Sequence, residues 1–363
     1  MNIGILTAGG DCPGLNAVIR GFAKYTYNQI PNVNLVGISG GYAGLITGET
    51  IKLQESDFSG ILNIGGTILG TSRRPFKEMK VENINGVSNL EMMVDNYKKL
   101  NLDLLITLGG AGTHKTANLL SNAGCNVIGL PKTIDNDIWG TDVTFGFHSA
   151  VATDTEFIDK IHTTAASHGR TMILELMGNR VGWLALYAGL AGGADIILLP
   201  EIPFDKDNIC ETVASRHDRG KDFTIIVIAE GCSSLSEEDM NKSRKIIYRV
   251  GEATITKKLA SYIQDQTGIE TRYSIPGHIQ RGGSPSPYDR LISTELGSYA
   301  GKLVQEGNFG TTVAVRNNEI TYNKLADIAG KIKYVPQDHQ MVNVARSIGI
   351  SFGDGKEYKD GTL

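Results

Sequence analysis

The segment Leu130 to Asp137 brings two carboxylates, an ammonium and a hydroxyl together directly after an apolar run, Asn126 to Leu130. The run is typical of a buried parallel strand, so the polar residues should follow its carboxyl end, where open α/β sheets bind ligands. Carboxylates at Asp135 and Asp137 suit phosphoryl transfer, because one can accept a proton from a hydroxyl while the other helps to hold a metal. Lys132 could neutralise phosphate oxygens. Taken alone, the segment fits a solvated turn with an Asx hydrogen bond equally well.

Glycine-rich turns follow other apolar runs. The run Ile3 to Thr7 leads into Gly9 to Gly14 and then into a helical pattern that starts at Leu15. The amides of such a turn and the following helix N-terminus form an anion site, although a tight turn without a ligand explains a lone motif equally well. Arg73 and Arg74 lie among glycines and hydroxyls, where they would clamp a polyphosphate unless they are solvated surface groups.

Strands followed by glycines recur along the chain and predict its fold class. Four such segments precede residue 140, at residues 3–14, 33–45, 61–75 and 102–113. They predict a mostly parallel, doubly wound α/β sheet whose turns gather on one edge. Residues 171–190 repeat the plan with a strand, a glycine turn and a helix. A second, similar lobe is therefore predicted to begin near residue 147.

The rest of the pattern predicts further strands at 196–201, 223–229 and 312–316, and helices at 115–123, 149–162, 252–265 and 289–304. Glu230 follows one of these strands and is placed to accept a ligand hydroxyl. The segment 271–285 combines cationic side chains with glycines and a serine, so it could bind a sugar phosphate. The last residues, 353–363, are polar and are expected to be loose.

The bulk composition limits the function classes. A chain of 363 residues exceeds the size at which single cores stop growing, so two lobes are expected. The net charge of −4 gives no basic patch for nucleic acid and no polybasic membrane surface, and no apolar run is long enough to span a bilayer. The first residues run straight into a strand without a secretory signal, so the cytoplasm is expected. The four cysteines lie far apart and are expected to be reduced thiols without disulfides or zinc.

These motifs, in this order and over nearly the whole chain, resemble the 6-phosphofructokinase family. The motifs that carry the resemblance are residues 9–17, residues 131–137, Met177-Gly178, residues 229–231 and residues 277–285. The resemblance implies two α/β lobes with an active-site cleft between them. Residues 1–146 plus roughly 280–331 would form the ATP lobe, and residues 147–279 plus the C-terminal segment would form the fructose 6-phosphate lobe. It also implies phosphorylation of fructose 6-phosphate to fructose 1,6-bisphosphate by ATP and Mg²⁺, the committed step of glycolysis.

The resemblance also implies a role for individual residues. Asp135 would take the proton from the sugar 1-hydroxyl, Thr133 would help to hold that sugar, and Asp137 would assist the metal. The donor contacts would be Gly10, Tyr42, Arg73, Arg74, Gly110, Ala111, Gly112 and Thr113, with Arg73 stabilising the transferring phosphoryl group. The sugar contacts would be Met177, Gly178, Asn179 and Glu230. The sugar-phosphate contacts would be Arg170, Arg272, His278 and Arg281. Arg170 would also belong to the catalytic set with Asp135, Thr133 and Arg73.

Two of the sugar-phosphate contacts are supplied across a subunit interface in bacterial members of the family. The resemblance therefore implies self-association into a homodimer or homotetramer.

Two positions bear on whether the donor is ATP or pyrophosphate. Gly112 stands where pyrophosphate enzymes of the family tend to carry an aspartate that would repel the α-phosphate of a nucleotide. Lys132 stands where many ATP enzymes have glycine and pyrophosphate enzymes have lysine. We give Gly112 more weight than Lys132 and expect ATP. Without the aspartate there is room for a nucleotide at Gly112, and a lysine at position 132 does not prevent nucleotide binding. The alternative is a pyrophosphate-dependent enzyme, which could also act on sedoheptulose 7-phosphate.

Ala111 departs from the family pattern, which has Asp, Asn or Glu near the Mg²⁺ that binds the donor phosphates. A methyl group cannot ligate a metal or its water. Either the activity is weakened, or Asp11 and Asp137 suffice, or alanine has been substituted here. A catalytically silent homologue that binds ligands and regulates is therefore a third hypothesis.

Overall fold

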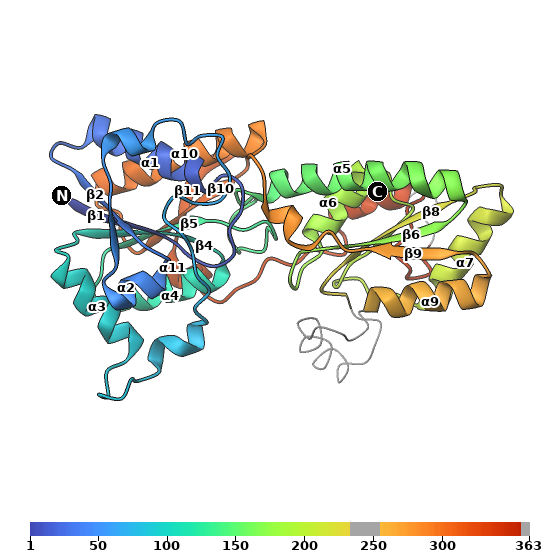
Figure 1. The fold of residues 1–363 in the computed structure, drawn as a ribbon, viewed down its shortest axis with the longest axis horizontal. Helices are drawn as coiled ribbons and strands as arrows, with labels where there is room; N and C mark the ends of the chain where they lie inside the picture. Colours follow the sequence, from blue (N-terminus) through green and yellow to red (C-terminus); the bar gives the residue numbers. More distant parts are fainter. Residues whose placement is uncertain (233–254, 357–363) are drawn as a thin grey trace. The chain divides into compact units, whose positions relative to one another are not determined.

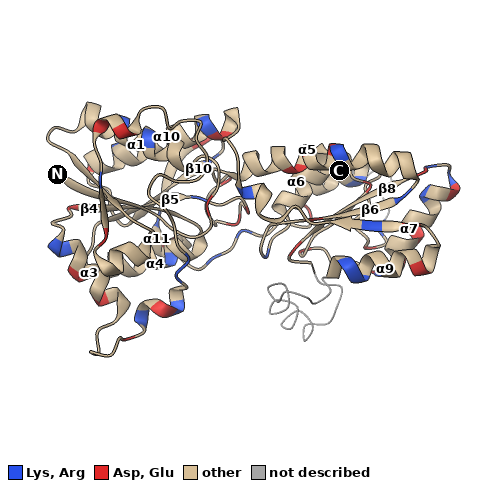
Figure 2. Ribbon diagram, viewed as in Figure 1, with Lys and Arg blue, Asp and Glu red and all other residues tan. Residues whose placement is uncertain are grey.

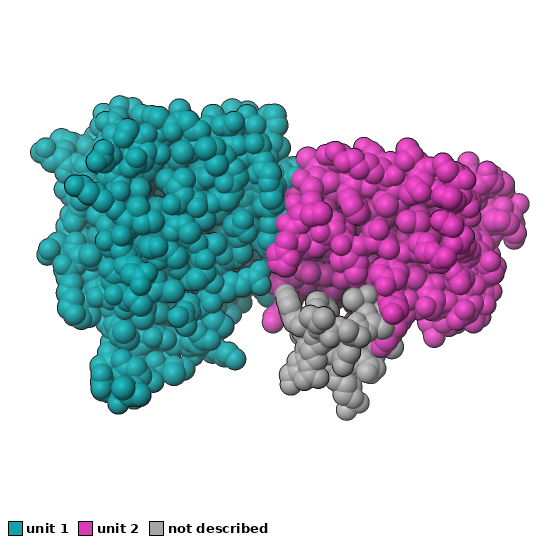
Figure 3. Space-filling view, in the orientation of Figure 1, with its two compact units in different colours: residues 1–149, 281–333 teal, residues 150–280, 334–363 magenta. Residues whose placement is uncertain are grey.

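The computed structural model describes residues 1–232 and 255–356. The chain forms two compact units, which Figure 3 colours separately. Unit 1 contains Met1–Ser149 and Arg281–Lys333, and unit 2 contains Ala150–Gln280 and Tyr334–Leu363. Helices carrying both acidic and basic residues occur in each unit (Figure 2). Among the described residues, no helix combines the length and the apolar character that crossing a membrane requires.

Unit 1 is built on a seven-stranded sheet of order β11-β10-β5-β4-β1-β2-β3. Its strands are β1 (Asn2–Thr7), β2 (Asn34–Ile38), β3 (Thr50–Lys52), β4 (Leu104–Gly109), β5 (Val127–Pro131), β10 (Thr311–Arg316) and β11 (Glu319–Lys324). The five inner strands are parallel, and the two edge strands, β3 and β11, pair antiparallel with their neighbours. Strands β4 and β5 are buried along their whole length, which explains why they are continuous apolar runs rather than alternating ones.

Helices cover both faces of this sheet (Figure 1). One face carries α1 (Leu15–Gln29) and α10 (Pro287–Glu306), and the other carries α2 (Tyr42–Thr47), α3 (Asn89–Lys99), α4 (Ala111–Asn122) and α11 (Leu325–Ile328). Helices α1 and α10 approach closely because glycines face the contact. A Cβ atom at Gly297 would lie 2.3 Å from the carbonyl oxygen of Val18. Two short 3₁₀ helices, η1 (Glu55–Phe58) and η2 (Phe76–Lys80), lie in the connections.

The strand order of unit 1 creates a topological switch point between β1 and β4. Strand β1 lies between β2 and β4, so the chain leaves β1 toward one side and returns on the other. Ligands bind at such a switch point, outside the carboxyl ends of the strands. The turns after β1 and β4 flank that point, and the segment 132–137 follows β5 on the same edge.

Unit 2 has a smaller sheet in which all four strands are parallel, with the order β7-β8-β6-β9. Its strands are β6 (Thr171–Leu176), β7 (Ile196–Leu198), β8 (Thr224–Ala229) and β9 (Thr271–Ser274). One face carries α5 (Phe147–His168) and α6 (Trp183–Ala191), and the other carries α7 (Lys206–Asp218) and α9 (Ile255–Thr267) (Figure 1). Helix α12 (Gln340–Ser347) packs on α6, and the 3₁₀ helix η3 (Gly277–Arg281) ends where the chain returns to unit 1.

The predicted mostly parallel α/β class is confirmed. The type or the bounds predicted for several elements are wrong. Residues 61–64 form no strand, because the side chain of Asn16 binds their backbone instead of a neighbouring strand. Its amide nitrogen donates to the carbonyl oxygen of Ile64 at 3.0 Å. The helix predicted from residue 115 begins at Ala111, directly after the glycines, and the strand predicted at 196–201 ends at Leu198.

The C-terminal segment predicted to be loose is anchored at its start. Phe352 is fully buried, and Arg346 Nη2 pairs with Asp354 Oδ2 at 2.7 Å. The amide of Asp205 also donates to the carbonyl oxygen of Gly353 at 2.8 Å. Residues 357–363 of that segment, and residues 252–254 of the helix predicted at 252–265, lie outside the described residues.

Candidate active site

The polar segment after β5 is buried in spite of its charges. Lys132, Thr133, Asp135, Asn136 and Asp137 are each less than one-tenth exposed. The segment folds on itself: the amide of Asp135 donates to Thr133 Oγ1 at 3.0 Å. Such a burial of two carboxylates costs free energy, so it is unlike the solvated turn that the sequence left open.

Asn136 sets the direction of the two carboxylates. It has a left-handed backbone with φ of 52°, a conformation that asparagine tolerates better than most residues. Its Oδ1 accepts from the amide of Thr144 at 3.1 Å. The hydroxyl of Thr144 in turn donates to the carbonyl oxygen of Thr133 at 2.8 Å. The left-handed residue therefore changes the direction of the backbone between Asp135 and Asp137, and Thr144 holds that geometry.

Three cationic side chains converge on the turn after β1. The Lys132 ammonium donates to the carbonyl oxygen of Gly10. A Cβ atom at Gly10 would lie 2.6 Å from Arg281 Nη1 and 3.2 Å from Arg73 Nη2, so only glycine leaves room for both guanidinium groups. Arg281 Nη1 also donates to the carbonyl oxygen of Asp11 at 3.2 Å. We call Arg73, Lys132 and Arg281 the cation cluster.

The cation cluster and the carboxylates act on each other electrostatically. Burial raises the pKa of Asp135, and the charges of Arg281 and Lys132 oppose that rise. One oxygen of this carboxylate, Oδ1, is buried without a hydrogen-bond partner. Burial, helped by the Asp135 charge, raises the pKa of Asp137 to about 7. Burial also lowers the pKa of Lys132. The arrangement can therefore take up a proton near neutral pH beside a concentration of positive charge.

The start of α4 presents free backbone amides on the same edge of the sheet. Gly110 is the N-cap and offers no side chain to bond the first amides of the helix. A Cβ atom at Gly112 would meet no atom within 4 Å, so this position borders open space. The amide end of a 12-residue helix with that opening suits an anion. Ala111 adds only a methyl group and no metal ligand.

Two of the predicted donor contacts, Tyr42 and Arg74, have partners outside the turn after β1. Tyr42 is buried in the core, and its hydroxyl donates to the carbonyl oxygen of Thr113 at 2.9 Å. This hydrogen bond shows that Tyr42 supports the first turn of α4. Arg74 is exposed and forms an ion pair with Glu78 at 3.7 Å.

In unit 2, the predicted sugar contacts gather at the carboxyl ends of β6 and β8. Glu230 Oε1 accepts from the amides of Gly178 and Asn179 at 3.2 and 2.6 Å. The amide of Met177 donates to the side chain of Gln280 at 3.0 Å. Gln280 was not among the predicted contacts, although it lies between His278 and Arg281 in the segment 277–285. His278 is exposed on η3.

Arg170 and Arg272 lie at the opposite end of the same sheet. Arg170 precedes β6, and Arg272 lies on β9, opposite Met172 near the start of β6. Both pair with Glu270, at 2.7 Å from Arg170 Nε and 2.5 Å from Arg272 Nη2. The hydrogen bond from Arg170 keeps the pKa of Glu270 below its usual value.

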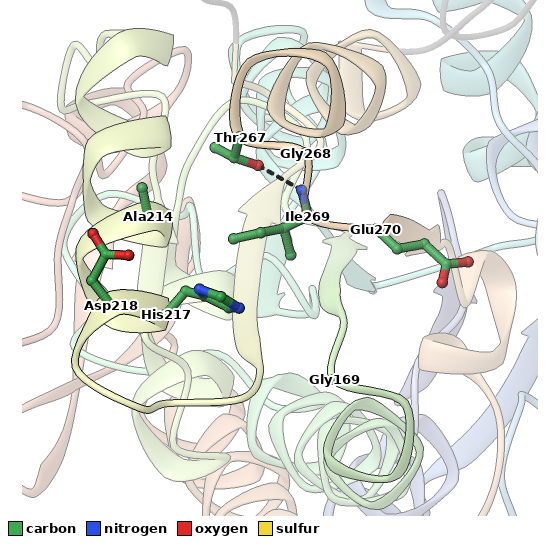
Figure 4. Close-up of a pocket in the computed structure, with 8 residues that line it drawn as sticks. All are labelled: Gly169, Ala214, His217, Asp218, Thr267, Gly268, Ile269 and Glu270. Carbon is green, nitrogen blue, oxygen red and sulfur yellow. Dashed lines mark hydrogen bonds between the residues drawn. The ribbon is translucent and has the colours of Figure 1, made fainter.

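A pocket of about 350 Å³ lies at that end of the sheet. His217 and Asp218 at the end of α7 line one side, and residues 267–270 line the other (Figure 4). Thr267 Oγ1 accepts from the amide of Ile269 at 3.2 Å and closes that turn. The pocket therefore does not include the residues predicted to bind the sugar ring.

The chain is similar to known proteins over most of its length. The model of the family described as Phosphofructokinase matches residues 2–304. The chain is 53% identical to an ATP-dependent 6-phosphofructokinase of Spirochaeta thermophila, over 97% of each chain. It is 44% identical to ATP-dependent 6-phosphofructokinase 3 of Bacteroides thetaiotaomicron, over 97% of this chain and all of that one.

A solved structure shares the fold as well. The T-state phosphofructokinase of Pichia pastoris superposes with a TM-score of 0.78 at 30% identity. The superposition covers 90% of this chain and 35% of the chain from Pichia, so this chain spans about a third of that longer protein.

Proposed function

The chain belongs to the phosphofructokinase family, and from that premise we infer its reaction. It transfers the γ-phosphoryl group of ATP to fructose 6-phosphate and gives fructose 1,6-bisphosphate and ADP, as the names of its relatives indicate. The observation that supports this reaction best is the position of Asp135. Its carboxylate is buried after β5 and interacts electrostatically with Lys132, Arg73 and Arg281.

We assign the base of the reaction to Asp135. Its carboxylate would accept the proton of the sugar 1-hydroxyl as that oxygen bonds to the γ-phosphorus. The bond from the γ-phosphorus to the bridging oxygen breaks, and ADP leaves with the electron pair. The reaction needs positioning and charge neutralisation more than covalent chemistry. Asp135 is positioned because Thr133 fixes its backbone, and the cation cluster supplies the charge neutralisation.

The donor phosphates would bind the turn after β1 and the first amides of α4. The open space beside Gly112 favours a nucleotide, because no side chain there obstructs the α-phosphate. Lys132 does not argue against ATP, since its ammonium is bound to the Gly10 carbonyl oxygen and serves the geometry of the turn. Arg281 would act in this half of the site, although the family resemblance assigned it to the sugar phosphate.

The residues present are compatible with Mg²⁺. Mg²⁺ keeps several waters and takes one or two carboxylates together with substrate phosphates. No group of three or more acidic, His or Cys side chains that could hold an ion occurs in residues 1–232 and 255–356, so a site made only of protein ligands is not expected there. Asp137, whose carboxylate is buried two residues after Asp135, is the group that would hold the ion, and Asp135 remains the base. When bound, Mg²⁺ supplies positive charge to the donor phosphates.

We propose that the sugar binds Glu230, Met177, Gly178 and Asn179, and that its phosphate binds arginines of a second copy of the chain. The six residues of β6 separate Arg170 from Met177. At the rise of a parallel strand this amounts to about 20 Å, which is too far for one hexose phosphate to bridge. A homodimer or homotetramer in which a partner supplies Arg170 and Arg272 would resolve this distance. His278 would add a further contact.

A comparison of donors tests the proposed reaction. The purified protein is assayed with fructose 6-phosphate and Mg²⁺, once with ATP and once with pyrophosphate, and fructose 1,6-bisphosphate is measured. We expect turnover with ATP. Turnover with pyrophosphate alone would reverse the donor, and tight binding of both substrates without turnover would identify a silent regulatory homologue. We place the reaction in the cytoplasm, where the four buried, unpaired cysteines would stay reduced.

A further inference from the structure

Lys333 contacts the loop that contains both carboxylates, from a distant part of the chain. It is the last residue of unit 1 before the chain enters unit 2. Its ammonium donates to Asn136 Oδ1 at 2.9 Å, to the carbonyl oxygen of Thr141 at 2.9 Å and to that of Asp142 at 2.8 Å. An ammonium can donate three hydrogen bonds, and these three acceptors all belong to the segment from Asn136 to Asp142.

The backbone of the same segment is also bonded to the loop. The amide of Lys333 donates to the carbonyl oxygen of Asp137 at 2.9 Å, and Ile332 forms an antiparallel bridge with Ile138. These backbone contacts therefore fix the position of the Lys333 Cα atom beside the loop. The long side chain then reaches around the loop to Asn136, so the two contacts hold the loop on both sides of Asp137.

We propose that Lys333 is a positioning residue for phosphoryl transfer, whose ammonium holds Asn136 in its left-handed conformation and thereby aims Asp135 and Asp137. The proposal depends on the proposed function of those two carboxylates. Asn136 Oδ1 accepts from both the Thr144 amide and Lys333, so its side chain cannot turn without losing both bonds. Without the ammonium, the carbonyl oxygens of Thr141, which is buried, and of Asp142 lose a charged donor.

Two substitutions of Lys333 test this role. Lys333→Met keeps the length of the side chain and removes the charged donor, whereas Lys333→Arg keeps a charge that persists above pH 12. We expect Lys333→Met to lower kcat at least tenfold with less than a threefold change in either KM. Lys333→Arg should retain at least a third of the turnover, because it keeps a charged donor. Lys331→Met, at an exposed lysine of the same segment, is the matched control and should behave as the wild type.

A readout without turnover separates this proposal from the proposed function. Hydrogen exchange of a peptide covering residues 133–145 should be at least tenfold faster in Lys333→Met than in Lys331→Met. If the wild type has no kinase activity but this exchange increases, the reaction is wrong and the contact is right. If Lys333→Met keeps the kcat and the exchange of the wild type, the positioning role is refuted. Should Lys333→Met fail to fold, the kcat and exchange of the wild type in Lys333→Gln refute it.

Discussion

The substitution Gly10→Ala adds one methyl group under the cation cluster and should lower turnover strongly. The added Cβ would lie 2.6 Å from Arg281 Nη1 and 2.9 Å from Arg281 Cζ. Carbon atoms pack at about 3.5 to 4.0 Å, so the guanidinium group must move by about 1 Å. A displacement of that size at a reacting centre costs up to about a hundredfold in rate. We therefore expect kcat for fructose 6-phosphate and ATP to fall between about tenfold and about a hundredfold.

The same substitution should change the stability of the fold little. Gly10 does not need a left-handed backbone, and the atoms that the methyl group meets are the mobile ends of Arg281 and Arg73. The expected loss in the free energy of unfolding is therefore about 1 kcal/mol. Thermal unfolding of Gly10→Ala beside the wild type measures it and shows whether a loss of rate reflects a loss of folded protein.

A double-substitution cycle decides whether the methyl group acts through Arg281. kcat is measured for the wild type, Gly10→Ala, Arg281→Ala and the double variant. If Gly10→Ala works by displacing the guanidinium group, it should cost at least tenfold less in the Arg281→Ala background, because that group is already absent. Full turnover of Gly10→Ala would refute the steric argument, and an equal loss in both backgrounds would refute the role of Arg281.

Three further predictions concern single side chains. Asp135→Ala should lower kcat by about a hundredfold or more with a smaller change in KM, because it removes the base; near-normal steady-state turnover would exclude that role. Ala111→Asp or Ala111→Asn should raise the Mg²⁺-dependent rate by adding a metal ligand, and no gain in a Mg²⁺ titration of either variant would show that this position is not limiting. Asp154 on α5 is fully buried, both of its carboxylate oxygens lack a partner, and burial raises its pKa to about 8. Since the folded state then binds the proton more tightly than the unfolded state, stability falls as the pH rises toward 8. The stability of Asp154→Asn relative to the wild type should grow by up to about 4 kcal/mol between pH 5 and pH 8. Urea unfolding at both pH values checks this, and an equal difference at both would contradict it.

The turns of the site could be read from the sequence because they depend on local chemistry. A strand buried on both faces must be a continuous apolar run, and a turn that approaches other groups closely needs glycine. Both signals are present at β1 and β4, and at β5 the apolar run leads into the charged segment. The order of strands, glycine turns and the charged segment was therefore predictable. The apolar run at residues 61–64 is also followed by glycines, and it was wrongly predicted to be a strand. Its backbone is bound by Asn16, and no local pattern shows that.

The sequence by itself determined the fold class, the family and the residue types that meet phosphate, because strand patterns and motif chemistry are properties of short segments. Only the tertiary structure decided which of those residues meet. Arg281 joins Lys132 and Asp135 because the chain returns to unit 1 at the end of η3, and Lys333 reaches Asn136 across 197 residues. Arg170 and Met177 lie at opposite ends of β6, although they are close together in the sequence. Such contacts depend on the order of strands in a sheet and on where the chain passes from one unit to the other. They are set by the packing of the whole chain, so no single stretch of sequence predicts them.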